Sequence, residues 1–364
     1  YWNALKEIED FMQNSSISTP SLRYLSKETE SFGGNLSTLE RISYFDRSGD
    51  DVTVPCGFMK EFPISDNDRI AMEACKGVVV VSAIFGDHDK IRQPRGLGSK
   101  TLDTVCFIMF VDDHTFRGLN SHNLLSEEDW EHKLGAWRIV RVSGELPYKN
   151  AAMNGVIPKH LVHRLLPNSK FSIWSDGKIQ LTVDPLLLIH SLIILKNADM
   201  AISKHPYYIH TIEEAMATSR WKKWGDIDSL QKQMETYCEH GLQPWTPNKL
   251  PYTSDVPDSA LILRKHGFES NLFSCLLFNE LEAFNPRDQL AFAFVRDHMS
   301  PKMNLNMFEV EVFEQIAMEY RHNIKRGGQN LAKQGSNTKR ASPNLVGTSK
   351  CEMYLSEMWG ESHS

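Results

Sequence analysis

Five short apolar runs, each of which stops abruptly at polar residues, constrain what this chain can fold into. In order along the chain, the runs cover residues 78–85, 105–111, 137–142, 171–174 and 200–203. Near-continuous apolar runs of this length are typical of parallel strands buried on both faces, and helical patterns lie between them. The sequence therefore predicts an α/β fold with a doubly wound, mostly parallel sheet and a cleft along one edge.

The fourth run is followed by the most informative turn. After Trp174 comes Ser175-Asp176-Gly177-Lys178, then an alternating strand over 179–183, then a helix that Asp184-Pro185 begins. An α/β fold delivers a carboxylate to the ligand-binding edge of its sheet in this way. Asp176 is equally compatible with a plain turn-forming Asp-Gly pair.

Composition excludes several function classes. The formal net charge is −6, so nucleic acid is not expected as a partner. The apolar runs are shorter than the roughly 18–20 residues that a membrane span needs. No Gly-x-Gly-x-x-Gly follows the first strand, and the sequence contains no Gly-Lys-Ser/Thr phosphate loop and no Gly-x-Ser-x-Gly elbow.

The chain divides into three predicted regions. Residues 1–54 read as a stem or linker, with an amphipathic helix over 1–12 and a loop-like stretch over 15–51. Residues 55–325 form the catalytic domain, and 326–364 form a basic, low-complexity tail that we expect to be disordered. Because the sequence opens on Tyr1, we expect a preceding segment, which a membrane anchor would fit.

The cysteines and two sequons favour the lumen of the secretory pathway. Cys56 and Cys75 flank a polar connection and are a candidate disulfide, whereas Cys106 and Cys275 lie in apolar runs and are predicted to be core thiols. Asn14-Ser15-Ser16 and Asn35-Leu36-Ser37 are N-glycosylation sequons in the polar N-terminal region.

Many ordered sequence blocks resemble one protein family. The blocks are Val81-Ser82-Ala83-Ile84-Phe85-Gly86, Asp89, Gln93-Pro94, Phe110-Val111-Asp112, His163-Arg164-Leu165, Ser172-Ile173-Trp174-Ser175-Asp176-Gly177-Lys178, Ile202-Ser203-Lys204-His205, Thr253-Ser254-Asp255-Val256-Pro257, Asn271-Leu272-Phe273-Ser274-Cys275, Phe278-Asn279-Glu280 and Arg287-Asp288-Gln289. They resemble a plant family long labelled as a domain of unknown function. It includes a mucilage-related hexosyltransferase of pectin synthesis and a turgor-regulation-defect protein described as an alkaline ceramidase.

The resemblance implies a Golgi type II membrane protein with a GT-A-like (Rossmann-like) glycosyltransferase domain in the lumen. The chain looks closer to the turgor-regulation branch. It carries Lys149-Asn150 where the hexosyltransferase branch has an acidic pair, and Val156 where that branch has a basic residue. It carries Pro206-Tyr207-Tyr208 where that branch has a basic, aromatic segment.

The resemblance also implies which residues form the site. A UDP-sugar donor would lie with its nucleoside near Asp89 and Asp112 and its diphosphate near Asp176, Lys178 and Gln180. A larger nucleotide-binding set adds Gly86, His205 and Gln289. Asp255, Glu280 and Asp288 are candidates for the general base on the acceptor side.

Metal dependence stays open. Many GT-A enzymes hold Mn²⁺ or Mg²⁺ with an Asp-x-Asp turn. Here Lys178 occupies the third position, and a lysine can bind phosphate directly as a point charge, so a metal-independent or weakly metal-dependent site is favoured. Alternatively, Asp176 could anchor a metal together with His266 or His298.

Two further functions remain open. One is hydrolysis of the ceramide amide to sphingoid base and fatty acid, with ligands drawn from His205, His210, Asp176 and Glu213. The other is a non-catalytic glycan-binding protein. The expected partners are thus a polysaccharide or a lipid, and a homo- or hetero-oligomer is open.

Overall fold

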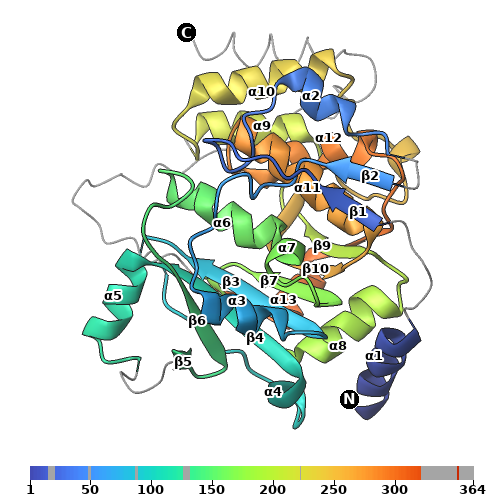
Figure 1. The fold of residues 1–364 in the computed structure, drawn as a ribbon. Coiled ribbons are helices and arrows are strands. Elements are labelled where there is room, and N and C mark those ends of the chain that lie inside the picture. Colours follow the sequence, from blue (N-terminus) through green and yellow to red (C-terminus); the bar gives the residue numbers. More distant parts are fainter. Residues whose placement is uncertain are drawn as a thin grey trace.

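The fold is built around an eight-stranded sheet (Figure 1). A computed structural model describes residues 1–14, 21–47, 51–86, 89–125, 132–221, 223–320 and 351. The strands are β1 (Ser21–Tyr24), β2 (Asp51–Val54), β3 (Val78–Ile84), β4 (Val105–Asp112), β5 (Lys133–Leu134), β6 (Trp137–Val142), β7 (Phe171–Ser175), β8 (Ile179–Leu181), β9 (Met200–Lys204), β10 (Pro257–Lys265), β11 (Leu305–Phe308) and β12 (Ala317–Glu319).

Helices cover both faces of this sheet (Figure 1). They are α1 (Trp2–Asn14), α2 (Thr38–Ser43), α3 (Asp66–Glu73), α4 (Thr101–Thr104), α5 (Asp113–Ser121), α6 (Ala151–His160), α7 (Val162–Leu165), α8 (Pro185–Ile189), α9 (Thr211–Arg220), α10 (Ile227–Glu239), α11 (Phe268–Ala283), α12 (Asp288–His298) and α13 (Val310–Ile316). A π-helix, His190–Ile194, follows α8, and a 3-10 turn covers Pro247–Lys249.

The strand order in the large sheet is β11-β9-β10-β7-β3-β4-β6-β5. The central strands β7, β3, β4 and β6 pair in parallel, whereas β10 runs antiparallel to both β7 and β9. The predicted α/β class with a mostly parallel sheet is confirmed. Because β10 is antiparallel, Leu261 in its middle pairs with Ser175 at the end of β7, and the residues before Leu261 extend beyond that end.

Alternating side chains of the central strands feed two separate cores. Val79 and Val81 of β3 pack in the cluster that includes residues of α6, α11 and α12, while Val78 and Val80 pack on the opposite face with α8. Successive residues of a strand point to opposite faces, so an almost wholly apolar strand has to be covered on both. This is the physical basis of the doubly wound arrangement.

The stretch expected to be loop-like is, in its described part, integrated into the domain. β1 and β2 pair with each other in parallel, and Phe32 is completely buried. Arg41 of α2 is also buried, with its Nε 2.9 Å from Glu280 of α11. The amphipathic helix predicted over 1–12 forms as α1, and its Leu5 and Ile8 pack into the core that α8 lines.

The cysteine predictions were wrong. Cys56 is bonded to Cys275, and Cys75 is bonded to Cys106. Cys56 and Cys75 therefore do not pair with each other, and Cys106 and Cys275 are not free thiols. Cys238 of α10 is bonded to Cys351. Apart from the buried Cys351, the tail expected to be disordered lies outside the described residues. No helix of the described part is both long and apolar enough to cross a membrane.

Candidate active site

A cavity of about 410 Å³ opens beyond the end of β7. Its wall combines parts of α6, the turn after β7, the start of β10, residues 223–224 and the start of α12. Charged side chains of both signs line it: Lys159, Asp176, Lys178, Lys223, Asp258, Arg287 and Asp288. The cavity thus lies at the edge where ligands bind in open α/β sheets.

The turn after β7 places Asp176 and Lys178 in this wall because Gly177 allows a close approach to β3. A Cβ on Gly177 would lie 2.9 Å from Cγ1 of Ile84. Asp176 Oδ1 accepts a hydrogen bond of 2.6 Å from the indole Nε1 of Trp174, which fixes the carboxylate. Both Asp176 and Lys178 therefore line the same cavity.

Lys159 lies in the same wall and bridges two carboxylates. Its ammonium is 2.8 Å from Asp288 Oδ2 and 3.6 Å from Asp176 Oδ1, and it donates to Ser259 Oγ at 3.1 Å. Burial alone would lower the pKa of Lys159, but Asp176 and Asp288 outweigh that effect and raise the pKa above its ordinary value. Lys159 therefore carries a fixed positive charge at the cavity wall.

Asp288 is the centre of a buried chain of polar contacts. Its Oδ1 accepts from Ser259 at 2.6 Å, and its Oδ2 accepts from His160 Nε2 at 3.2 Å as well as from Lys159. Arg264 donates to His160 Nδ1 at 3.3 Å. Burial alone would raise the pKa of Asp288, but Lys159 and His160 reverse this and hold the pKa well below its usual range. Both oxygens of Asp288 already accept hydrogen bonds, and a carboxylate with so low a pKa is a weak proton acceptor. Asp288 is therefore poorly suited to act as a general base.

Asp258 differs from Asp288 in both respects. Its Oδ1 accepts from the backbone N–H of Ala260 at 3.1 Å, and among the described residues no hydrogen bond to its Oδ2 is formed. Burial raises the pKa of Asp258 above its ordinary value, and Lys178 only partly opposes this. A carboxylate with a free oxygen and a raised pKa, at a cavity wall, has the properties of a general base.

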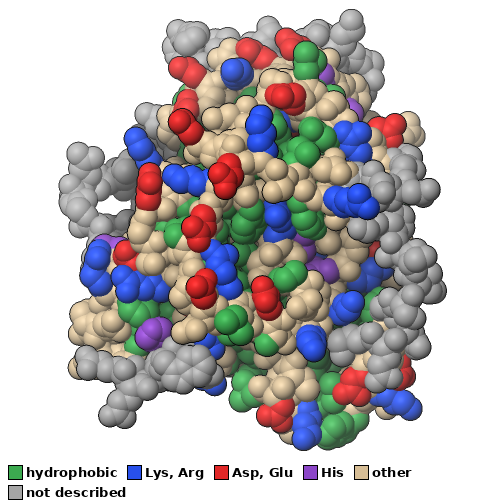
Figure 2. Space-filling view, viewed as in Figure 1, with side chains coloured by type: hydrophobic (Ala, Val, Ile, Leu, Met, Phe, Trp, Pro, Cys, Tyr) green, Lys and Arg blue, Asp and Glu red, His purple; other side chains and the backbone are tan. Residues whose placement is uncertain are grey.

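The remaining cations are paired at the cavity rim. Lys178 Nζ lies 2.7 Å from Glu319, and Lys223 Nζ lies 3.3 Å from the fully buried Glu214. Arg287 also pairs with Glu214. Figure 2 shows basic and acidic side chains interspersed over one face of the molecule rather than gathered by sign. Each cation of the cavity lining is therefore held by at least one carboxylate.

The structure does not bring Asp255 and Glu280 to the cavity. Asp255 is fully buried and lies 2.6 Å from Arg296 and 2.8 Å from Lys249. Glu280 is bonded to Arg41, and its other oxygen accepts from Tyr237. Fully buried carboxylates need such partners. Asp255 is paired with α12 and Glu280 with α2, so neither is available as the general base expected on the acceptor side.

The expected nucleotide-binding residues are spread along the sheet edge. Asp112 caps α5 and accepts from the Gly86 N–H at 2.8 Å, so the ends of β3 and β4 are joined there. Asp89 lies 3.4 Å from the position of a Cβ on Gly177, next to the turn. Gln180 instead donates to the Gln93 carbonyl and is buried away from the cavity lining. Gln289 lines the cavity.

The residues around Asp176 do not offer a ready metal site. Oxygen ligands suit Mn²⁺ and Mg²⁺, but the groups nearest the Asp176 carboxylate are an ammonium and an indole N–H. His266 bonds to Ser169 and Ser172, and His298 donates to the Phe294 carbonyl, so neither faces Asp176. The donor set fits an anionic ligand better than a cation.

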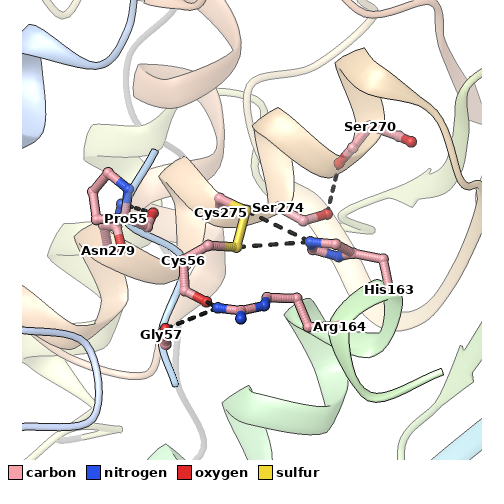
Figure 3. Close-up of a disulfide and its surroundings, with 9 residues drawn as sticks. All are labelled: Pro55, Cys56, Gly57, His163, Arg164, Ser270, Ser274, Cys275 and Asn279. Atoms are coloured by element: carbon pink, nitrogen blue, oxygen red, sulfur yellow. Dashed lines mark hydrogen bonds between the residues drawn. A yellow bond between two sulfur atoms is a disulfide. The ribbon is translucent and has the colours of Figure 1, made fainter. Parts of the chain in front are cut away.

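Within the described residues, one cluster has the proximity that metal ligands need: Cys56, His163 and Cys275. Figure 3 shows that its two sulfurs form the disulfide, with His163 Nε2 at 3.7 and 3.6 Å from them. Arg164 donates to the carbonyls of Cys56 and Gly57, both at 2.9 Å. The cluster is therefore a clamp between residues 55–57 and α11.

Sequence reasoning missed Lys159, Lys223, Asp258 and Arg287. Asp258 lies three positions after Asp255, which the sequence singled out, and Lys159 lies at the end of α6. Arg287 directly precedes Asp288. The available signal was the tendency of charged residues to sit where a helix or strand begins or ends, which local sequence alone cannot distinguish from capping.

The fold and the cavity define an α/β protein with a cavity lined by charged side chains at the carboxyl edge of its central parallel strands. A family model described as "TOD1/MUCI70, glycosyltransferase-like domain" matches residues 17–322. The chain therefore belongs to the TOD1/MUCI70 family and carries its glycosyltransferase-like domain, as the resemblance implied.

Two relatives from Arabidopsis thaliana are similar over long stretches. The chain is 59% identical over 377 aligned positions to "Alkaline ceramidase TOD1", covering 99% of this chain and 81% of the relative. It is 40% identical over 292 positions to "Probable hexosyltransferase MUCI70", covering 77% of this chain and 49% of that protein. The higher identity to the first agrees with the expected branch.

Two solved structures also resemble the chain. They are mouse xyloside xylosyltransferase 1, with a TM-score of 0.38 and 6% identity over 64% of this chain and 85% of that one, and the WbbM bifunctional glycosyltransferase, with a TM-score of 0.31 and 10% identity over 64% and 39%. These scores are too low to support an argument about mechanism.

Proposed function

We propose that the cavity binds the diphosphate of a UDP-sugar and that the domain transfers a hexose or hexuronic acid to a cell-wall polysaccharide. The observation that carries this proposal is the placement of Lys159, Lys178, Lys223 and Arg287 around one cavity at the carboxyl edge of the sheet. The first turn of α12 lies in the same wall, and the N-terminus of a helix favours anions.

The cations would act on the leaving group. When the bond between the anomeric carbon and the diphosphate oxygen breaks, its electron pair stays on the diphosphate, and negative charge grows there. Fixed ammonium and guanidinium groups stabilise that charge without reorganising. Lys159 is already held by Asp288, so it needs no ordering when the donor binds. Asp176 would position the ammoniums of Lys159 and Lys178.

Asp258 would be the general base. In an inverting transfer the acceptor hydroxyl attacks the anomeric carbon, and its proton passes to a carboxylate on that side. Asp258 supplies a free Oδ2 at the cavity wall, whereas Asp288 has both oxygens occupied. This assignment replaces Asp255, Glu280 and Asp288 as candidates for the base. A divalent metal would be at most an auxiliary, because the lysines already supply positive charge.

Calorimetry with a panel of UDP-hexoses and UDP-hexuronic acids tests the proposal. We expect one donor to bind and Lys178→Ala to lose that binding together with transfer. Lys265→Ala is the matched control: it removes a half-buried lysine, paired with Asp199 at 2.7 Å, from the opposite end of β10. Binding of no UDP-sugar by the unmodified domain would refute the proposal.

Ceramide hydrolysis is the second candidate, because of the 59% identity to a protein named alkaline ceramidase. The charged cavity offers little apolar surface for acyl chains, which favours the transferase. The test is release of sphingoid base from ceramide at alkaline pH by the purified domain. Activity that Asp176→Ala abolishes, with no UDP-sugar binding, would reverse the ranking. A glycan-binding protein with neither activity is the third outcome.

We also propose that the domain works in the Golgi lumen, anchored as a type II protein by a segment outside this sequence. The three disulfides support this location, since such bonds persist in oxidising compartments. Localisation of the tagged full-length protein by microscopy, combined with protease protection of Golgi vesicles, tests the proposal. A cytosolic location of the domain would exclude it.

A further inference from the structure

The loop between β9 and α9 presents an exposed aromatic ring to water. Tyr207 is 82% exposed. The loop that carries it is nonetheless ordered by His205, whose Nδ1 accepts from the N–H groups of Tyr207 and Tyr208 at 3.2 and 3.1 Å. His205 also stacks on Tyr208, with the ring centroids 5.0 Å apart. The backbone that carries the exposed ring is thus held in place, and the Tyr207 ring makes an edge contact with His205 at 5.9 Å between centroids.

This loop adjoins the cavity through Lys223. The Lys223 ammonium lies 5.7 Å from the centre of the Tyr208 ring, and both Lys223 and its neighbour Trp224 line the cavity. The indole Nε1 of Trp224 is buried and has no hydrogen-bond acceptor among the described residues. Trp221, two positions before Lys223, is 51% exposed. Trp224 therefore lines the cavity with an unsatisfied donor, and Lys223 connects the cavity to the ring of Tyr208.

We infer that Tyr207, with Trp224 at the cavity wall, forms an acceptor subsite that binds the sugar rings of a glycan chain. The C–H face of a pyranose packs on an aromatic ring, and a fixed ring pays little entropy on binding. A hydroxyl of the sugar next to the reaction centre would accept from the Trp224 indole. The role of the bound glycan as acceptor rests on the proposed function, whereas glycan binding itself needs no donor.

Ion pairing limits the charge that the rim of this subsite offers to a ligand. Glu214, 4.0 Å from His205, pairs with both Lys223 and Arg287. Ring stacking rather than charge is therefore the main attraction that the rim offers.

Binding without a donor tests the subsite directly. The probes are hexagalacturonate and cellohexaose, titrated into the intact domain by calorimetry and by saturation-transfer NMR. We expect at least one oligosaccharide to bind, and Tyr207→Ala to weaken it about fivefold to tenfold, the loss of one ring stack. Tyr207→Phe keeps the ring and should bind like the unmodified protein. Trp2→Ala, which removes a 61% exposed ring from α1, is the matched control.

In the transfer assay, Tyr207→Ala should raise the KM for the acceptor and leave the KM for the donor unchanged. Equal oligosaccharide affinity of the Ala variant, or binding of neither oligosaccharide, overturns the inference. So does Tyr207-dependent binding to phosphatidylcholine–phosphatidylserine vesicles in place of sugars. If Tyr207-dependent glycan binding is found but no UDP-sugar binds, the subsite stands and the proposed transfer falls.

Discussion

Replacing Lys159 by Met should destabilise the domain far more than the same change at Lys178, although both lysines line the cavity. The Lys159 ammonium lies 2.8 Å from Asp288, and at an effective dielectric constant of about 20 this contact has a Coulomb energy of about 6 kcal/mol before desolvation is subtracted. Breaking a buried pair by removing one partner costs about 3–5 kcal/mol, because the remaining charge is left uncompensated. Asp288 would be that charge.

Lys178→Met provides the matched comparison. Lys178 pairs with Glu319, whose side chain is 51% exposed, so water can replace the lost ammonium. Pairs of this kind contribute about 0–1 kcal/mol. Urea unfolding of the two variants at neutral pH should therefore give losses of about 3–5 and below about 1 kcal/mol. Calorimetry with the UDP-sugar identified for the unmodified domain should show weaker binding for both.

Urea unfolding tests the buried ion pair, and calorimetry tests the contact of each lysine with the donor. A loss below about 1 kcal/mol for Lys159→Met would refute the assignment of a buried, mutually dependent Lys159–Asp288 pair. A double variant with Asp288→Asn should recover part of the loss, since the uncompensated charge is then removed as well. Unchanged donor affinity in both variants would refute their proposed contact with the diphosphate.

Three shorter predictions follow from the same contacts. Asp258→Asn should abolish transfer but keep donor binding, and in the unmodified enzyme the rate should fall as pH decreases through the raised pKa of Asp258, because a base acts only when ionised. Replacing Cys56 and Cys275 by Ser should lower the free energy of unfolding in urea by about 5 kcal/mol, and replacing Cys75 and Cys106 should lower it by about 4 kcal/mol. The difference arises because the two disulfides close loops of 219 and 31 residues, so equal losses would contradict this prediction. EDTA should reduce donor affinity less than Lys178→Met does, and complete loss of binding that Mn²⁺ restores would show a required metal.

The sheet was predictable because its signal is local. The runs over 78–85, 105–111 and 137–142 became β3, β4 and β6 with bounds that differ by at most one residue. The first two are almost wholly apolar and buried on both faces, whereas the third carries Arg138 and the exposed Arg141. The amphipathic helix predicted over 1–12 likewise forms as α1. By contrast, β11 carries Asn306 within a short run, and its pairing with β9 is set by tertiary contacts.

The disulfides could not be predicted because pairing is a property of distance in space. Cys56 and Cys275 are 219 positions apart, yet α11 carries Cys275 to the segment that precedes Phe58. The apolar surroundings of Cys275 and Cys106 predicted buried thiols. Cys275 is completely buried, although it forms a disulfide. The local sequence does not show how residues 21–47 and 51–54 fold. Their packing against α11 brings Cys56 to its partner.

The site shows the same division between local and tertiary information. Asp176 and Lys178 were found because a strand end and a glycine turn mark them within four residues. Lys159 and Asp258 reach the cavity from α6 and from the antiparallel strand β10, and nothing in their own neighbourhoods indicates that these elements converge on β7. Asp255 was preferred over Asp258 although three positions separate them. The register shift of β10 between Asp258 and Ile262 places Asp258 at the wall, while Asp255 turns inward to Arg296. A parallel sheet thus identifies the edge where chemistry occurs, but the antiparallel strand inserted beside it decides which carboxylate is available there.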